Sequence, residues 1–379
     1  MKNSPLTVLQ VVPQMDCGAT ARDVVEYALA VKETGGVPLV VSNGGKLVNE
    51  LRRHGVEHFT ADIASRFNTL KNVRLLKTLI AERGVDIVHA RGRAAAACVK
   101  KAVAKTDVPF VTSYDGPYDD GKFGLKKSYN SVLFQGNAVF APSLFVKDSL
   151  QKRFGVSEEK IHLIPSCIDE KRFDISAVSM DRMIAQAKKW RLPDDVPVLF
   201  FPTYHRTKKE YQTVLNALTQ MRHKDFLCLF VNESKLSAAQ KGSFENKIRK
   251  MGLTEVVRYI DGCAEPELAY ALADIVLCLR SKEEAFSRSV LETQYMGRLA
   301  VAYDHGGVPE LIENGETGFL AKPDDASDLA NVLDAALDLP FENRQKIIAR
   351  SRDFVKLRFG QKAVRAAVAN AYRTIALKK

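Results

Sequence analysis

The sequence predicts an α/β protein with two parallel-sheet domains, and three observations support this fold class. Short β-rich runs alternate with longer stretches whose apolar residues recur every three or four positions, which is typical of strands covered by helices. The alternation stops near residue 165 and restarts near residue 196, so the chain has two similar halves. With 379 residues, the chain is also long enough for two hydrophobic cores.

The first half begins with a predicted strand at residues 6–12, and a turn at 16–18 separates it from a helix with one apolar face. Further strands are expected at 37–41, 85–89, 108–112, 138–141 and 161–164. An irregular segment, 165–173, and a charged helical stretch, 180–191, follow, and we interpret them as the linker. We place the N-terminal domain at residues 1–172 and the C-terminal domain at 173–359.

The second half repeats the pattern, with strands expected at 196–201, 226–231, 256–260, 274–279 and 299–303. Ligands of open parallel sheets bind beyond the carboxyl ends of the strands. Two such halves imply a cleft between them, and functional residues are expected in the loops that follow the strands.

Composition narrows the class of protein. No uncharged apolar run approaches 18 residues, and the first apolar stretch is too short for a secretory signal, so we expect a cytoplasmic protein. The net charge of +11 is uneven, because residues 1–172 hold 25 Lys and Arg against 18 Asp and Glu. That excess suits an anionic membrane or substrate, and no nucleic-acid-binding motif accompanies it. The histidines and cysteines lack metal-ligand spacing, and His89 is expected in the core.

Two glutamates eight residues apart form the most informative motif. Glu284 lies in a loop after a predicted strand, and Glu292 lies in a helix that starts near Ser287. The free N–H groups of Phe286, Ser287 and Arg288 at the helix start suit an anion or a hydroxyl-rich ligand, and carboxylates accept hydrogen bonds from sugar diols. From the spacing alone, a glutamate that stabilises the helix dipole and a second one facing solvent explain the pair equally well.

A glycine-rich loop follows the glutamate pair along the chain. The strand expected at 299–303 leads into His305, Gly306 and Gly307, and glycines let the backbone approach a ligand closely because they lack a Cβ. Residues 314–318, Asn-Gly-Glu-Thr-Gly, then predict a tight turn into another short strand.

Taken in order, these motifs resemble glycosyltransferase family 4, in which a Glu-x(7)-Glu pair precedes a Gly-Gly-x-x-Glu loop and a Gly-x-x-Gly turn. The segments 86–91, 129–136, 141–145 and 164–169 resemble the N-terminal half of the same family. The resemblance covers almost the whole chain and is strongest to bacterial enzymes that build lipopolysaccharide cores or other envelope glycans.

The resemblance implies a GT-B fold, with two Rossmann-like domains facing across a cleft and a C-terminal helix, 360–379, crossing back to the N-terminal domain. It implies retaining transfer of a hexose-type sugar from a nucleotide-diphosphate sugar, without a metal or another cofactor. By this resemblance, Glu284 contacts the donor sugar and Glu292 the ribose. Lys209 matches the lysine that holds the diphosphate, and Arg206 or Lys208 stands in for the matching arginine.

The chain departs from the family pattern at several ligand-facing points. The usual Gly-Gly after the first strand is replaced around Gly18 and Ala19, whose backbone still offers N–H groups to a phosphate. Asp115 stands where the family has a histidine near the reacting carbon, and Arg280 stands where it has a serine. Either the donor is unusual, or catalysis is weakened or lost.

The leading hypothesis is therefore a metal-independent retaining glycosyltransferase at the inner face of the membrane, with an envelope glycan or lipid-linked glycan as acceptor. The alternative is a sugar-nucleotide-binding subunit with weak or no activity. A nicotinamide-dependent oxidoreductase is excluded, because no Gly-x-Gly-x-x-Gly follows the first predicted strand.

Overall fold

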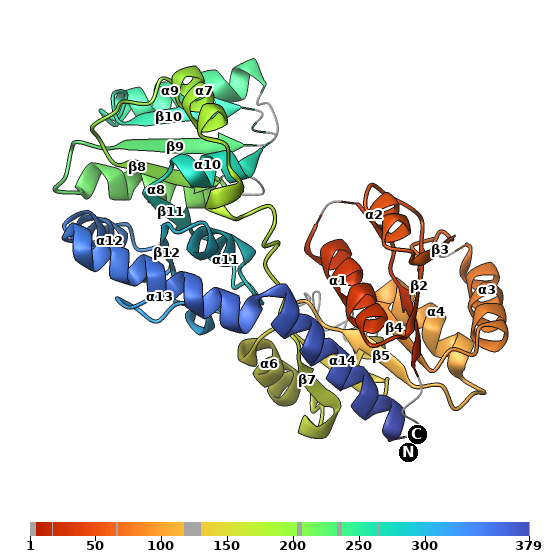
Figure 1. The fold of residues 1–379 in the computed structure, drawn as a ribbon. Coiled ribbons are helices and arrows are strands. Elements are labelled where there is room, and N and C mark those ends of the chain that lie inside the picture. The colour runs from red at the N-terminus through yellow and green to blue at the C-terminus, as the bar shows by residue number, and fades with distance from the viewer. Residues whose placement is uncertain are drawn as a thin grey trace. The chain divides into compact units, whose positions relative to one another are not determined.

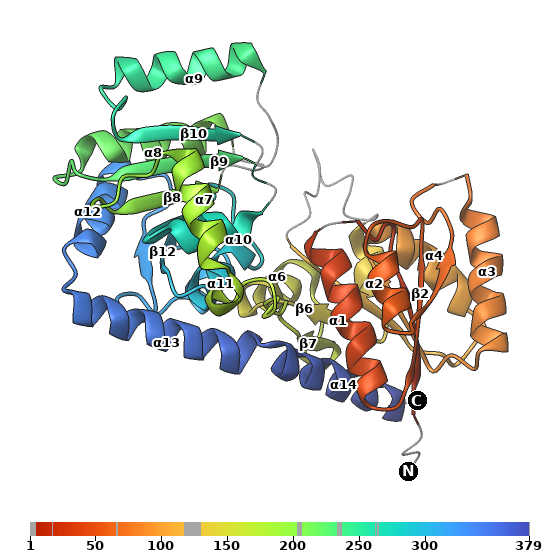
Figure 2. The ribbon, with the colours of Figure 1, turned by 45° about the horizontal axis from the view of Figure 1, so that its top comes forward.

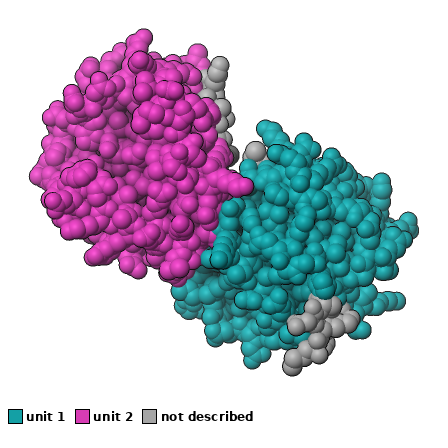
Figure 3. All heavy atoms as spheres, in the orientation of Figure 1, with its two compact units in different colours: residues 1–167, 361–379 teal, residues 168–360 magenta. Residues whose placement is uncertain are grey.

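The computed structural model describes residues 5–16, 18–65, 67–116, 130–202, 207–232, 237–261, 263 and 265–378. The chain divides into two compact units, shown in different colours in Figure 3. Unit 1 comprises Met1–Cys167 and Gln361–Lys379, and unit 2 comprises Ile168–Gly360. Each unit is an α/β structure built on a parallel sheet, which confirms the predicted fold class (Figure 1).

In the described part of unit 1, seven parallel strands form a sheet in the order β3-β2-β1-β4-β5-β6-β7. The strands are β1 (Thr7–Val11), β2 (Val37–Ser42), β3 (Glu57–Thr60), β4 (Ile87–Arg91), β5 (Phe110–Ser113), β6 (Ala138–Ala141) and β7 (Ile161–Leu163). The helices are α1 (Ala19–Glu33), α2 (Val48–Arg53), α3 (Thr69–Glu82), α4 (Arg93–Val103), α6 (Leu144–Phe154) and α14 (Gln361–Leu377).

The last helix, α14, packs beside α1, the first (Figures 1 and 2). Tyr372 of α14 reaches the core of unit 1, where its hydroxyl lies 2.7 Å from Nδ1 of His89. The other ring nitrogen of His89, Nε2, lies 2.9 Å from Ser113 Oγ. His89 is fully buried, as expected, and burial holds its pKa well below the usual value, with the charge of Arg91 adding to this effect.

In the described part of unit 2, six parallel strands have the order β10-β9-β8-β11-β12-β13. The strands are β8 (Val198–Pro202), β9 (Leu227–Asn232), β10 (Val257–Asp261), β11 (Ile275–Cys278), β12 (Leu299–Tyr303) and β13 (Phe319–Ala321). The helices are α7 (Met180–Trp190), α8 (Lys208–Gln220), α9 (Ala238–Lys250), α10 (Pro266–Leu272), α11 (Arg288–Tyr295), α12 (Ala326–Leu337) and α13 (Phe341–Phe359). Among the described residues, no helix is both long and apolar enough to cross a membrane.

Two local features differ from the sequence expectations. Strand β3 was not predicted, because it is a short edge strand of mixed polar and apolar residues that pairs with β2 alone. The stretch interpreted as linker contains α7, which belongs to unit 2. Trp190 at its end is only 5% exposed and packs in a core cluster with Phe173 and Val178. Burial of this large side chain fixes α7 to the unit.

Candidate functional site

The loop after β11 carries Glu284 and packs tightly against the loop after β12. The backbone N–H of Gly307 donates to the carbonyl oxygen of Glu284 at 2.8 Å. Gly306 has φ +62°, and a Cβ there would lie 2.6 Å from the same carbonyl oxygen and 3.0 Å from the Glu284 nitrogen. Glycine is therefore required at position 306 both by backbone conformation and by space.

Charged side chains gather at the same two loops. Nε of Arg280 lies 3.7 Å from Oε1 of Glu284, and these side chains are 30% and 26% exposed. His305 donates from Nε2 to the carbonyl oxygen of Arg280 at 2.8 Å. The structure thus brings together five residues singled out in the sequence, namely Arg280, Glu284, His305, Gly306 and Gly307.

Helix α11 begins directly after this cluster, where the sequence predicts a helix start. The Ser287 side chain makes no capping hydrogen bond, so it leaves first-turn N–H groups of the helix uncapped. Phe286 packs against Phe359 with ring centroids 5.6 Å apart. The backbone at residues 286–288 is therefore held by core packing, while its helix start keeps donors for a ligand.

Glu292 lies one turn further along α11 and has a different environment from Glu284. Its Oε2 accepts a hydrogen bond from the Tyr270 hydroxyl at 2.8 Å. Burial raises the pKa of Glu292 above its usual value, although the charge of Arg288, the Tyr270 hydrogen bond and the charge of Arg172 act in the opposite direction. A partly buried carboxylate with neighbouring arginines is suited to accept from a diol.

Lys209, in the first turn of α8, reaches the glutamate cluster through an aspartate. Its Nζ lies 2.6 Å from Oδ2 of Asp324, and the Lys209 side chain is 67% exposed. Asp324 also accepts a hydrogen bond from Ser281 Oγ. Burial raises the pKa of Asp324, but the hydrogen bonds from Lys209 and Ser281 and the charge of Lys209 outweigh it, so the net shift is downward. This pairing was not predicted, because the two residues are 115 positions apart in the chain.

Lys208 and Arg206 are the two other cations that were predicted to hold the diphosphate. Lys208 lies near Lys247 of α9, whose pKa is lowered by burial and by the charge of Lys208. Arg206 lies outside the described residues.

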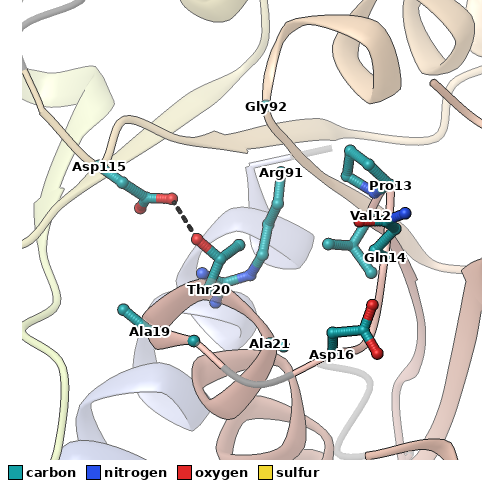
Figure 4. A pocket seen from close by; sticks show the side chains of 11 residues that line it. Val12, Pro13, Gln14, Asp16, Ala19, Thr20, Ala21, Arg91, Gly92 and Asp115 are labelled. Atoms are coloured by element: carbon teal, nitrogen blue, oxygen red, sulfur yellow. Dashed lines mark hydrogen bonds between the residues drawn. The ribbon is translucent and has the colours of Figure 1, made fainter. Parts of the chain in front are cut away.

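A second cluster lies in unit 1, at the carboxyl ends of β1, β4 and β5. Gly18, Ala19 and Asp115 line one pocket of about 350 Å³ (Figure 4). Oδ2 of Asp115 accepts a hydrogen bond from Thr20 Oγ1 at 3.3 Å. Arg91, the last residue of the segment 86–91, also lines this pocket, and no role was predicted for it. Its place at the end of a predicted buried strand was the sequence feature that could have indicated a functional residue.

Each unit carries a polar cluster at the ends of strands in a parallel sheet, which is where ligands of such sheets bind. The family model for "Glycosyltransferase Family 4" matches residues 21–172, and the model for "Glycosyl transferases group 1" matches residues 183–354. Together these matches cover most of the chain, which belongs to the family 4-like glycosyltransferases with a GT-B fold.

Comparisons with individual proteins agree with this family. A glycosyltransferase from Rickettsia africae is 28% identical, with a TM-score of 0.86 and 99% of both chains covered. Anabaena Alr3699/HepE in complex with UDP shares the fold at 17% identity, with a TM-score of 0.81 and coverage of 97% of this chain and 100% of that one.

Among curated proteins, MMP alpha-(1->4)-mannosyltransferase of Mycolicibacterium hassiacum is 30% identical over 196 residues, which are 51% of this chain and 43% of that protein. The chain spans less than half the length of the first curated relatives it matches.

Proposed function

We propose that the protein is a retaining, metal-independent glycosyltransferase that moves a hexose from a nucleotide-diphosphate sugar to a lipopolysaccharide-core or other envelope glycan. The tight contact between the Glu284 backbone and Gly306–Gly307 carries this proposal, because it holds a carboxylate beside the uncapped start of α11. The mannosyltransferase relative and the UDP complex of the structural neighbour support a sugar-nucleotide donor.

In this proposal, the donor binds unit 2. Glu284 accepts from sugar hydroxyls, Glu292 accepts from the ribose diol, and the N–H groups at the start of α11 face the ligand. Lys209, with Arg206 or Lys208, stabilises the negative charge that develops on the departing diphosphate. The departing phosphate oxygen takes the acceptor proton, so no separate general base is assigned.

Transfer assays over a panel of UDP-, GDP- and ADP-sugars test the proposal. We expect turnover with one donor class, and we expect Glu284→Gln to remove it while leaving the fold intact. Glu283→Gln is the matched control, because Glu283 is exposed and adjacent in the chain. Transfer that is equal in the wild type and Glu284→Gln would reject the role of this carboxylate.

A second candidate function is a sugar-nucleotide-binding subunit without efficient catalysis. Two observations favour it: Lys209 is already paired with Asp324 at 2.6 Å, and Arg280 lies 3.7 Å from Glu284. Nucleotide binding by calorimetry, without turnover of any donor in the panel, is the outcome this candidate predicts. Turnover that depends on Glu284 eliminates it.

We also propose that unit 1 contacts the cytoplasmic face of an anionic membrane. Phe67, two residues before α3, and Leu70, in its first turn, are strongly exposed. Lys71, Arg74 and Lys77 of α3 are exposed at three-residue spacing. Apolar side chains beside a row of cations suit an interface of anionic lipids. Co-sedimentation should recover the protein with phosphatidylglycerol vesicles and not with phosphatidylcholine vesicles, and equal recovery would count against the contact.

A further inference from the structure

The pocket of unit 1 contains a buried arginine whose hydrogen-bonding capacity is largely unused. Arg91 is the last residue of β4, and its side chain is 1% exposed. Nη1 lies 3.8 Å from Oδ2 of Asp23, too far for a hydrogen bond, and the guanidinium carbon lies 4.2 Å from the centroid of the Tyr27 ring. Within the described part of the chain, Nε and Nη2 have no hydrogen-bond partner.

The charges of Asp23 and Asp115 partly compensate the buried guanidinium, but they leave its Nε and Nη2 without acceptors. A guanidinium stays protonated in proteins, and burying its charge without acceptors for its N–H groups is destabilising. A carboxylate or phosphate group relieves the cost, because a guanidinium binds two of its oxygens at once through parallel N–H groups. The unused N–H groups of Arg91 therefore indicate an oxyanion as the missing partner.

Two helix starts border the same pocket. Gly18 precedes α1 with φ +146°, Gly92 precedes α4 with φ +82°, and neither has a side chain to cap the helix. The first helical hydrogen bonds run from Arg22 N–H to the Gly18 carbonyl at 3.1 Å and from Ala96 N–H to the Gly92 carbonyl at 3.0 Å. Earlier N–H groups lie outside these ladders and favour an anion.

Figure 4 shows how the buried charge and the helix start meet. The Arg91 side chain runs from β4 toward Thr20 in the first turn of α1, and the Asp115 carboxylate lies on the other side of Thr20. Arg91 and the start of α1 therefore act on the same part of the pocket.

Carboxylates in the pocket narrow the class of ligand. Asp16 and Asp115 line the pocket together with Arg91. Two carboxylates beside one guanidinium repel a group with several negative charges, such as a diphosphate. They accept hydrogen bonds from hydroxyls. The matching ligand is rich in hydroxyl groups and carries a single negative charge.

We propose that this pocket binds the acceptor, and that the acceptor is an acidic sugar whose carboxylate or phosphodiester is held by Arg91 and the first turn of α1. The inference rests on the proposed glycosyl transfer, for which it names the acceptor class. It assigns the backbone N–H groups at Gly18 and Ala19 to the acceptor rather than to a donor phosphate. In this proposal, Asp16 and Asp115 accept hydrogen bonds from the acceptor's hydroxyls.

Calorimetric titration of the full chain tests the assignment. The probes are methyl glucuronide, which carries a carboxylate, glycerophosphoinositol, which carries a phosphodiester, and methyl glucoside, which is neutral. We expect at least one of the two anionic probes to bind roughly 10-fold or more tightly than methyl glucoside. We expect Arg91→Met to lower the affinity for that anionic probe by about 10- to 100-fold, which is the contribution of one charge-assisted bidentate contact.

Two further variants control the result. Arg91→Lys keeps the buried charge and lacks the bidentate geometry, so it retains the fold and loses part of the anion preference. Arg93→Met leaves binding unchanged, because Arg93 donates from Nη1 to Asn130 Oδ1 at 3.0 Å and does not line the pocket. Equal binding of charged and neutral probes, or full anion preference in both Arg91 variants, overturns the inference.

Titration with UDP distinguishes an anionic acceptor from the donor diphosphate as the ligand of Arg91. We expect Arg91→Lys to bind UDP within about twofold of the wild type, since the inference assigns Arg91 to the acceptor. A loss of UDP affinity equal to the loss of anionic-sugar affinity would assign Arg91 to the donor diphosphate and overturn the inference. Anionic-sugar binding through Arg91 in a chain that transfers nothing would reject the proposed function alone. Transfer to neutral sugars at unchanged KM in Arg91→Lys would reject this inference alone.

Discussion

The polar clusters of the two units differ in how their charges are balanced. In unit 2, Lys209 is paired with Asp324 and Arg280 lies near Glu284. In unit 1, Arg91 is buried with two of its nitrogens lacking hydrogen-bond partners among the described residues. Lys209 is therefore held in an ion pair before a ligand arrives, whereas Arg91 keeps two donor nitrogens that a ligand could use.

This comparison has a consequence for ligand binding. A diphosphate that takes Lys209 must compete with Asp324, so binding in unit 2 exchanges one ion pair for another. An anion that takes Arg91 gains contacts without breaking any hydrogen bond of Nε or Nη2. Substitution of Lys209 should therefore remove both ion pairs and lower turnover, whereas substitution of Arg91 should mainly weaken ligand binding.

The largest expected effect is on turnover. Lys209→Ala should lower turnover of the identified donor by about 10²–10³, the usual effect of removing one preorganised donor to developing charge. Steady-state kinetics measure this loss. Lys224→Ala is the control, because Lys224 is exposed and donates to the Thr219 carbonyl oxygen within unit 2. Wild-type turnover in Lys209→Ala would remove this lysine from the mechanism.

The second-largest expected effect is on the stability of unit 2, and it tests whether the loops after β11 and β12 pack tightly against each other. Gly306→Ala places a Cβ 2.6 Å from the Glu284 carbonyl oxygen in a residue with φ +62°. Gly315→Ala is matched, since Gly315 has φ +81° and open space around it. We expect Gly306→Ala to destabilise unit 2 by about 1–3 kcal/mol more than Gly315→Ala, from overpacking alone. Equal midpoints in thermal unfolding would show that the two loops separate freely.

The smallest effect concerns pH. Burial raises the pKa of Glu292 in the folded state, so the folded protein binds this proton more tightly than the unfolded chain does. The contribution of Glu292 to stability is therefore full below its unfolded pKa and is lost as pH rises through the raised folded value. Glu292→Gln, which can still accept from Tyr270, should flatten this part of the pH dependence of the unfolding midpoint. An unchanged pH profile would contradict the raised pKa.

The fold and part of the site were readable from local patterns. β12 and the helix start after Ser287 follow from apolar runs, caps and turns, which act within a few residues. The edge strand β3 escaped because its residues are mixed in polarity. The functional partners escaped for a different reason: Asp324 meets Lys209, and Asp115 meets Thr20, only through the packing of strands distant in sequence.

Arg91 shows most clearly what local patterns omit. Its residue type and its place after an apolar run are visible in the sequence, but its burial and the unused state of Nε and Nη2 depend on β4, α1 and the Tyr27 ring together. A buried arginine whose N–H groups are all hydrogen-bonded indicates no ligand, whereas one with unused N–H groups indicates a binding site.

The most direct test of the account is a crystal structure of the full chain bound to the sugar nucleotide that it uses as donor. We predict Glu284 oxygens within about 2.6–3.2 Å of sugar hydroxyls and Lys209 Nζ on a phosphate oxygen instead of on Asp324. A bound donor whose sugar lies away from Glu284, with the Lys209–Asp324 pair intact, would contradict the account.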